Sequence, residues 1–260
     1  MTTNLGVAVI TGAGSGLGRA LAIAFSERGF TVAGLGRRGD ALARTGAELK
    51  AGSFHPFVCD VSDTAAVRTT FRKIDALGLP INILVSNAAI YDRFDILERP
   101  PEIYMQTLDI NVGGYLNCAH AALSRMAATG RGRIINVTSF ADISPLASSG
   151  AYSVSKGAGR LVTRALVADL ADRFPGITIT DWIPGALATD MGIADGLAPE
   201  VAAQWCVSLS MLTEPTLNGA LFDRDQEFQP SRSLKRKLKD LILWRRPPAP
   251  IILQGKARTP

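Results

Sequence analysis

The chain has 260 residues, of which 47% are hydrophobic and 20% are charged, so it can bury a large core without disulfide support. No apolar run is long enough for a membrane span, and the residues before the first strand-like run do not have the pattern of a signal peptide, so export is not expected. Cys59, Cys118 and Cys206 are odd in number and widely spaced, unlike the cysteines of a disulfide framework. The net charge is +5, but residues 231–260 hold nine Lys or Arg and one Asp. Residues 1–230 therefore carry a net charge of −3, which argues against nucleic-acid binding by the body.

Short apolar runs alternate with longer helical patterns along the first 230 residues. Runs such as VAVI and INILV are continuously apolar, which is typical of parallel strands buried between two layers of helices. The pattern predicts an α/β fold, a single doubly wound Rossmann-type domain with a central parallel sheet flanked by helices on both faces. We expect this domain over residues 1–230 and a separate tail over 231–260. The predicted strands are 7–10, 31–35, 54–58, 81–85, 133–137 and 178–182, and the predicted helices are 19–28, 40–50, 64–77, 101–128 and 152–173.

A glycine-rich turn, TGAGSGLG at residues 11–18, joins the first strand to the first helix. Glycines at 12, 16 and 18 allow a sharp turn and close approach of the backbone to a pyrophosphate, while the helix N-terminus offers free N–H groups to the anion. The turn therefore predicts a dinucleotide site. We expect it to include Gly12, Ser15, Gly16, Leu17 and Gly18.

The ends of the second and third strands bear on the choice of nucleotide. The second strand ends in Gly36-Arg37-Arg38, where an acidic residue would bind the adenosine ribose of NAD. Gly36 leaves room for a 2′-phosphate and Arg37 can pair with it, so we expect NADP. Asp60, followed by Val61, can accept a hydrogen bond from the adenine amino group; the alternative is that Asp60 caps the next helix.

Tyr152 and Lys156 lie four residues apart at the start of a predicted helix, so their side chains share one face. A nearby ammonium group favours the phenolate form of a tyrosine. Ser139 follows a predicted strand and should lie at the same sheet edge, where ligands bind in open α/β folds. These three residues are the candidate catalytic group.

Taken together, these motifs resemble the classical short-chain dehydrogenases/reductases over about residues 5–225. The motifs stand in the family's order and at its spacing: the glycine turn, Asn87, Asn111, Ser139, Tyr152-x-x-x-Lys156 and Pro184-Gly185-x-x-x-Thr189. Three departures stand out. Ser86-Asn87-Ala88-Ala89 replaces the family's N-N-A-G, Ser15 takes the place of a basic residue that many NADP-using members have, and the family's terminal V-D-G-G is missing.

The resemblance implies a role for each catalytic residue. Tyr152 would be the general acid or base, and Ser139 would hydrogen-bond the reacting oxygen. Lys156 would hold the nicotinamide ribose and lower the pKa of Tyr152, Asn111 would hold a relay water, and Thr189 would bind the carboxamide. The implied nucleotide set is Gly12, Ser15, Gly16, Leu17, Gly18, Arg37, Asp60, Val61, Asn87, Tyr152, Lys156, Pro184, Gly185 and Thr189.

The predicted function is therefore an NADP-dependent oxidoreductase acting on a carbonyl or secondary alcohol in the cytoplasm, without a metal. Apolar residues after Thr189, together with Tyr91, Phe140, Ile143 and Leu146, favour a hydrophobic substrate of medium size; the alternative is that half of them belong to the core. The competing interpretation is an NADP-binding sensor or scaffold without turnover. The resemblance also implies a homodimer or homotetramer packed through the helices at 101–128 and 152–173.

The tail combines basic and apolar residues. Leu234, Leu238, Leu241 and Ile242 recur at helical spacing beside several lysines and arginines, which predicts a basic amphipathic helix. Such a helix can bind weakly to an anionic membrane surface. The alternative, which we favour, is that its apolar face docks on the body or on a partner subunit.

Overall fold

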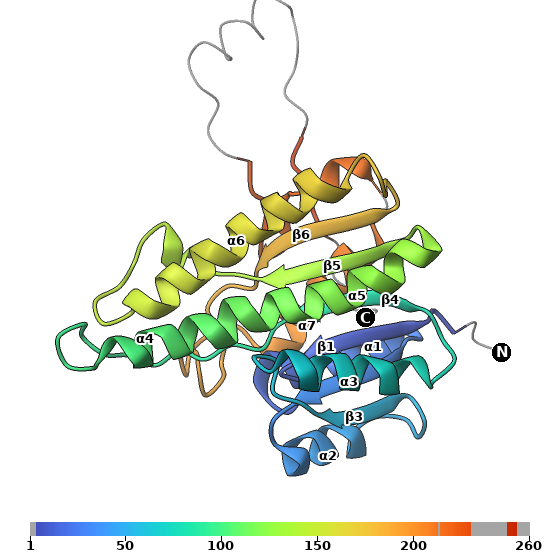
Figure 1. Cartoon of the computed structure of the whole chain (residues 1–260), viewed down its shortest axis with the longest axis horizontal. Helices are drawn as coiled ribbons and strands as arrows, with labels where there is room; N and C mark the ends of the chain where they lie inside the picture. Colours follow the sequence, from blue (N-terminus) through green and yellow to red (C-terminus); the bar gives the residue numbers. More distant parts are fainter. Residues whose placement is uncertain (1–3, 213, 230–248, 254–260) are drawn as a thin grey trace, which may run out of the picture.

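The computed structural model describes residues 4–212, 214–229 and 249–253. Its centre is one eight-stranded sheet in the order β3-β2-β1-β4-β5-β6-β7-β8, in which all neighbours are parallel except the antiparallel β7–β8 pair (Figure 1). The predicted doubly wound α/β fold is confirmed. The strands are β1 Val7–Thr11, β2 Thr31–Gly36, β3 Phe54–Val58, β4 Ile81–Ser86, β5 Gly132–Val137, β6 Ile177–Ile183, β7 Leu221–Asp223 and β8 Gln226–Glu227.

Helices cover both faces of the sheet. One apolar core lies between the sheet and α1 (Gly16–Arg28), α2 (Gly39–Ala47) and α7 (Pro199–Met211). The other lies between the sheet and α3 (Thr64–Asp75), α5 (Gly114–Thr129) and α6 (Gly150–Leu170). Because strand side chains alternate, the strands β1 to β6 supply both cores; in β1, Ala8 and Ile10 enter the first core while Val7 and Val9 enter the second.

A π-helical turn interrupts the long helix that was predicted at 101–128. α4 (Pro101–Leu108) runs through this turn, Asp109–Gly113, directly into α5 (Figure 1). The backbone dihedral angles stay helical on both sides of the turn, so the chain continues without a break. The turn places Asn111 at the edge of the sheet where the strands end.

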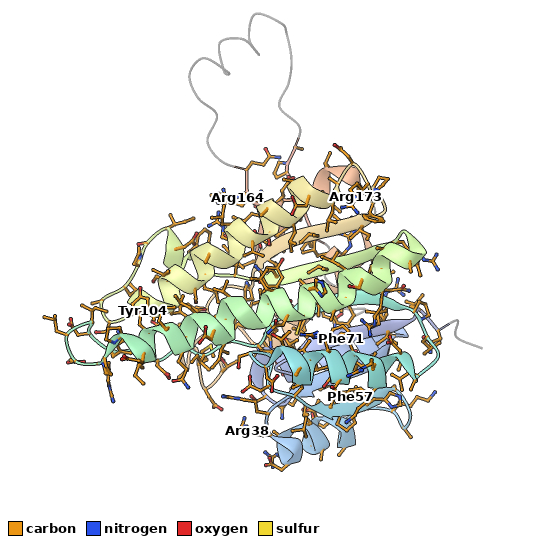
Figure 2. The ribbon with its side chains drawn as sticks, in the orientation of Figure 1. Arg38, Phe57, Phe71, Tyr104, Arg164 and Arg173 are labelled. Atoms are coloured by element: carbon orange, nitrogen blue, oxygen red, sulfur yellow. The ribbon has the colours of Figure 1, made fainter. Side chains whose placement is uncertain are left out.

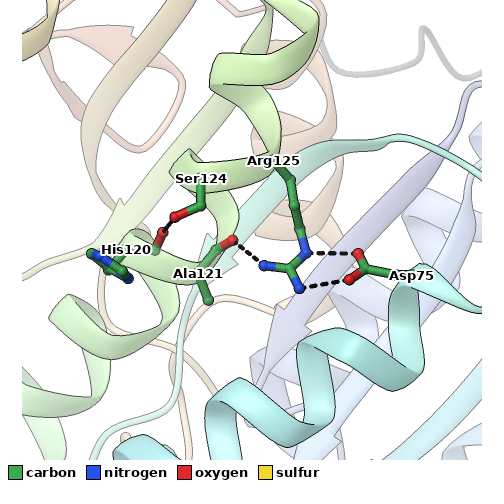
Figure 3. Close-up of polar contacts among 5 residues, drawn as sticks. All are labelled: Asp75, His120, Ala121, Ser124 and Arg125. Atoms are coloured by element: carbon green, nitrogen blue, oxygen red, sulfur yellow. Dashed lines mark hydrogen bonds and ion pairs between the residues drawn. The ribbon is translucent and has the colours of Figure 1, made fainter.

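An ion pair joins α3 to α5 on one face of the sheet (Figure 3). The Arg125 guanidinium donates two hydrogen bonds of 2.6 Å to the carboxylate of Asp75 and a third, of 2.8 Å, to the Ala121 carbonyl. It also lies 5.4 Å from the centre of the Phe71 ring. The start of α3 is fixed by Asp63, whose carboxylate accepts from two N–H groups of the first turn.

The chain returns to the sheet after the residues that the structure leaves out. Ile252 forms an antiparallel bridge with Gln226, and the Glu227 N–H donates to the Ile251 carbonyl at 2.8 Å. Leu253 is 3% exposed and belongs to the core under α1 and α7. The amphipathic helix predicted around 234–242 lies outside the described residues, and the division at residue 230 stays a prediction. Among the helices described, none is both long enough and apolar enough to cross a membrane.

Candidate active site

The glycine turn leaves the N-terminus of α1 open. Ser15 is the N-cap residue, but its side chain makes no capping hydrogen bond, and the first turn of α1 has no acidic residue. Gly12 and Gly16 have φ of +70° and +49°, which favour glycine, and a Cβ on Gly18 would overlap the Gly12 carbonyl. Free N–H groups at a helix N-terminus bind phosphates well, so this cradle fits the pyrophosphate of a dinucleotide.

The ends of β1 and β4 are held together by Asn87 and Thr11. The Asn87 amide donates to the Thr11 carbonyl at 2.9 Å, and the Thr11 hydroxyl accepts from the N–H groups of Asn87 and Ala88, both at 2.9 Å. In this structure the predicted nucleotide residue Asn87 therefore braces the backbone beside the glycine turn. The loop after β6 reaches the same place, because the Thr189 methyl lies 3.1 Å from where a Cβ on Gly16 would stand.

Arg37 is exposed just after the end of β2. The pKa of the nearby Asp60 carboxyl group is lowered mainly by hydrogen bonds from Ser62 and, to a smaller extent, by the charge of Arg37. Asp60 accepts from the Ser62 N–H at 2.9 Å and from its hydroxyl at 2.7 Å. The alternative that Asp60 caps the next helix is wrong, because Asp63 is the capping residue. Val61, also predicted to contact nucleotide, packs in the core under α3 and α5.

The structure brings Ser139, Tyr152 and Lys156 together at the carboxyl end of β5. Burial raises the pKa of the Tyr152 hydroxyl more than a side-chain hydrogen bond with Ser139 lowers it, so the lowered pKa expected for Tyr152 is not found in this structure. The Lys156 ammonium lies 5.5 Å from the centre of the Tyr152 ring and donates to the Val137 carbonyl at 2.7 Å. Burial lowers the pKa of Lys156 to about 8, against the opposing effect of Asp181.

Asn111 is buried in the π-helical turn, and its amide group is fully engaged. Its oxygen accepts from the Ile90 N–H at 2.8 Å, while its nitrogen donates to the Ile90 carbonyl at 3.0 Å and the Ser155 hydroxyl at 2.9 Å. The side chain thus ties the loop after β4 to α6. Beside it lies a cavity of about 10 Å³, large enough for one water. Its polar lining comes from Thr11, Ser86, Asn111, Tyr115, Asn136 and Lys156.

Aromatic rings stand next to the catalytic group. The Tyr91 ring lies 4.4 Å from the Tyr152 ring, and its hydroxyl is 2.7 Å from that of Ser149. Phe140, which follows Ser139, meets Phe228 edge to face with ring centres 6.0 Å apart. The sequence did not suggest Phe228, because its position beside Phe140 depends on the late strands β7 and β8.

Only some of the apolar residues that were predicted to contact a substrate are available to one. Leu209 is fully buried, and Leu197, Trp205 and Leu212 pack against the core. The alternative that half of these residues belong to the core is therefore correct for these four residues only. The exposed members are Ile143, Leu146, Met191, Val201 and Met211.

The family profile described as short chain dehydrogenase matches residues 6–197. That span includes the glycine turn, the Ser139, Tyr152 and Lys156 cluster and the loop after β6. The chain belongs to the short-chain dehydrogenase family. This short-chain dehydrogenase is therefore an oxidoreductase, of a family that acts on alcohols or ketones with a nicotinamide cofactor.

Relatives of this short-chain dehydrogenase include enzymes named for different substrates. Galactitol 2-dehydrogenase (L-tagatose-forming) of Cereibacter sphaeroides is 33% identical over 200 residues, 76% of this chain and 78% of the relative. The 3beta-hydroxysteroid dehydrogenase of Mediterraneibacter gnavus is 31% identical over 222 residues, 82% of this chain and 79% of the relative. A crystal structure of a short-chain dehydrogenase from Streptomyces avermitilis has a TM-score of 0.76 at 24% identity and covers 86% of this chain and 89% of its own.

Proposed function

We propose that this protein transfers hydride reversibly between NADP(H) and a carbonyl or secondary alcohol, with Tyr152 as the general acid or base. The carrying observation is the cluster at the end of β5, where Tyr152 and Ser139 interact and the Lys156 ammonium lies 5.5 Å from the Tyr152 ring. These three side chains would supply a proton donor, a second hydrogen-bond donor and a positive charge to the reacting oxygen.

In the reduction direction, the substrate carbonyl oxygen accepts hydrogen bonds from the Ser139 and Tyr152 hydroxyls. Tyr152 donates its proton to that oxygen as charge develops on it, and the Lys156 ammonium stabilises the phenolate that is left. In the oxidation direction, the phenolate removes the alcohol proton. The cofactor, when bound, supplies or accepts the hydride. Its nicotinamide ribose would be held by Lys156 and its carboxamide by Thr189.

NADP rather than NAD is proposed from the exposed Arg37 at the end of β2, beside Gly36. Gly36 presents no side chain of its own beside Arg37, and a Cβ there would make only ordinary van der Waals contact with Leu42. Asp60, the nearby acidic group, already accepts two hydrogen bonds from Ser62 and lies beside Arg37. A guanidinium group in this position favours a 2′-phosphate, since it can donate two hydrogen bonds to it.

The substrate is proposed to be hydrophobic and of medium size. Tyr91, Phe140 and Phe228 place aromatic rings near Tyr152 and Ser139, and Ile143 and Leu146 are 55% and 64% exposed close by in the chain. Of the two relatives compared above, the one named for a steroid substrate fits this surface better than the one named for a sugar alcohol. Apolar surface of this kind gains free energy when a ligand removes it from water.

Assembly into a homodimer or homotetramer is proposed through α5 and α6. Leu116 on α5 is 41% exposed, and Leu161 on α6 is 60% exposed. Ala165 and Asp169 are also exposed on the outer face of α6, whereas Val162 and Leu166 pack on the core. A monomeric mass by light scattering at micromolar concentration would contradict this assembly.

The test of the proposed function is Tyr152→Phe, which removes the exchangeable proton and little else. The variant should bind NADPH as the parent does but lose about a thousandfold or more in kcat. Ser153→Ala is the matched control, because the Ser153 hydroxyl is buried without a hydrogen-bond partner among the described residues. A Tyr152→Phe variant that kept a tenth of the parent kcat would disprove the assignment. Binding of NADPH without turnover of any carbonyl class would favour the sensor or scaffold alternative.

A further inference from the structure

A buried carboxylate lies in the sheet on the same side as Lys156. Asp181 is in the middle of β6, is 4% exposed, and pairs in register with Asn136 of β5. Its Oδ1 accepts from the Thr163 hydroxyl at 2.7 Å and from the Asn136 amide at 3.1 Å. No Lys or Arg within the described residues lies close enough to form an ion pair with it. A buried charge without an ion-pair partner costs free energy of folding.

One face of α6 connects Asp181 to Lys156. Lys156, Gly159 and Thr163 are spaced at three and four residues, so all three lie against the sheet. Thr163 bonds Asp181, and a Cβ on Gly159 would stand 3.3 Å from the Asn136 amide nitrogen. Asn136 and Lys156 also line the same water-sized cavity. The two charges are therefore separated by the Asn136 side chain and one small cavity, in surroundings of low dielectric where their interaction is strong.

The other charged and titratable groups around Asp181 are few. Burial has the largest effect on its carboxyl group and raises the pKa to about 6, although the hydrogen bonds from Thr163 and Asn136 and, to a lesser extent, the charges of Arg160 and Arg164 of α6 lower it. Arg164 lies on the outer part of α6 (Figure 2), and Arg160 is held by Asp142 at 2.7 Å. Tyr115 of α5 shares the Thr163 hydroxyl at 3.2 Å, and burial raises the pKa of this tyrosine. Asp181 is thus ionised at neutral pH.

We propose that Asp181 is a buried counter-charge for Lys156 and that it acts on Tyr152 through that lysine, as a positioning residue. The second half of this proposal rests on the proposed function, in which Lys156 stabilises the Tyr152 phenolate. Burial alone makes Lys156 lose its proton more easily. The negative charge of Asp181 opposes this loss and keeps the lysine cationic in the pH range where the phenolate must form.

The proposal predicts the direction in which the pH profile moves when the Asp181 carboxylate is removed. Without the carboxylate, Lys156 becomes neutral at a lower pH, and a neutral lysine does not favour the phenolate. The acidic limb of kcat/KM for alcohol oxidation should then move to higher pH. A direct effect of Asp181 on Tyr152 has the opposite sign, because removing a negative charge would lower the pKa of the phenol and move the limb to lower pH.

The experiment titrates Lys156 by NMR in protein labelled with 13C at the lysine Cε, with the signal assigned through Lys156→Arg. In Asp181→Asn the midpoint should fall by about half a unit to one unit, and the acidic limb should rise by a similar amount. Asp181→Glu should restore both values towards those of the parent. Thr163→Val is the control, since it removes a hydrogen bond to Asp181 but keeps the charge. Asp181→Ser replaces Asp181→Asn if the latter does not fold.

The parent protein provides a measurement that needs no variant. Its Lys156 signal should show a smaller second inflection near pH 6, because burial raises the pKa of Asp181 to about 6. Absence of that inflection, or a Lys156 midpoint in Asp181→Asn within about 0.2 units of the parent, would overturn the proposal. An acidic limb that moves to lower pH would overturn the route through the lysine. The NMR titration needs no turnover, so loss of the proposed function by the Tyr152→Phe test would leave the coupling of the two charges intact.

Discussion

The two halves of the sheet carry different kinds of chemical group at the site. Around β1 and β2 the site is made of backbone, glycines and the neutral pair Thr11 and Asn87, and no ionisable side chain in β1 or β2 is buried. Around β5 and β6 lie the buried ionisable groups Lys156 and Asp181. A nucleotide brings its own charge and needs N–H groups and space. Proton transfer instead needs side chains whose proton affinity the protein controls, and burial provides that control.

The substitution with the largest expected effect adds one methyl group to the glycine turn, in the half of the sheet around β1 and β2 where the nucleotide is proposed to bind. In Gly18→Ala the new Cβ would overlap the Gly12 carbonyl, so the turn must open or the helix must shift. Unfolding in urea should show a loss of several kcal/mol, on the order of 3, and NADPH binding should be lost by calorimetry. Gly113→Ala is the control, because Gly113 has helical φ and ψ and no atom within 4 Å of its Cβ position. Equal stability of the two variants would refute this close packing.

The buried carboxyl group of Asp181 should make the stability of the protein depend on pH. Burial raises the folded-state pKa of Asp181 to about 6, against a usual value of 3.8. The folded protein therefore binds the proton more tightly, and the stability that the protonated group contributes is present below pH 3.8 and is lost as the pH rises through 6. The stability of the parent minus that of Asp181→Asn should fall by up to about 3 kcal/mol between pH 4 and pH 7. A flat difference in urea unfolding across this range would contradict it.

A smaller effect is expected from changing the charge of Arg37, which is proposed to contact the 2′-phosphate of NADP. Arg37→Asp replaces an attractive charge with a repulsive one, so the ratio of NADPH to NADH affinity should fall by about tenfold to a hundredfold, or 1.4 to 2.8 kcal/mol. Arg38→Asp is the matched control. Arg38 is the exposed N-cap residue of α2 and lies beside the same strand end (Figure 2), and its replacement should change the ratio much less. A parent protein that binds NADH more tightly than NADPH would contradict the proposed preference for NADP.

The smallest effect concerns the partly exposed ion pair between α3 and α5. Arg125→Met keeps an apolar stem near Phe71 but loses the paired hydrogen bonds to Asp75. Because Asp75 is 47% exposed and Arg125 27% exposed, solvent screens the pair, and urea unfolding should show a loss of about 1 kcal/mol or less. Arg72→Met, which removes only an exposed bond to Thr69, is the control and should cost less. A loss in Arg125→Met well above 1 kcal/mol would contradict the expectation that solvent screens this ion pair.

Much of this architecture could be predicted because strand burial and the glycine turn are local properties of the sequence. The six strands from β1 to β6 were predicted within one residue at most of their ends, and the predicted catalytic residues meet at one sheet edge because parallel strands end there. Other features depend on contacts distant in the chain. The apolar residues after Thr189 were interpreted as a substrate surface, although several of them lie in α7 or beside it and pack on the core, and the π-helical turn has no local signal. Asp181 was missed because a single acidic residue in an apolar strand gives no indication of its partners.

The π-helical turn has a further consequence for how one long helix serves two partners. An α-helix advances by about 100° per residue, so the extra residue of a π turn changes the rotational phase of everything that follows it. α5 turns Tyr115, Cys118 and Ala122 towards the sheet, whereas α4 meets the start of α6, where Tyr104 (Figure 2) lies against Gly150. Removing one residue from 109–113 would bring both segments into a single phase. Either the sheet or α6 would then meet the wrong side of the helix, and Asn111 would no longer face Ile90 and Ser155.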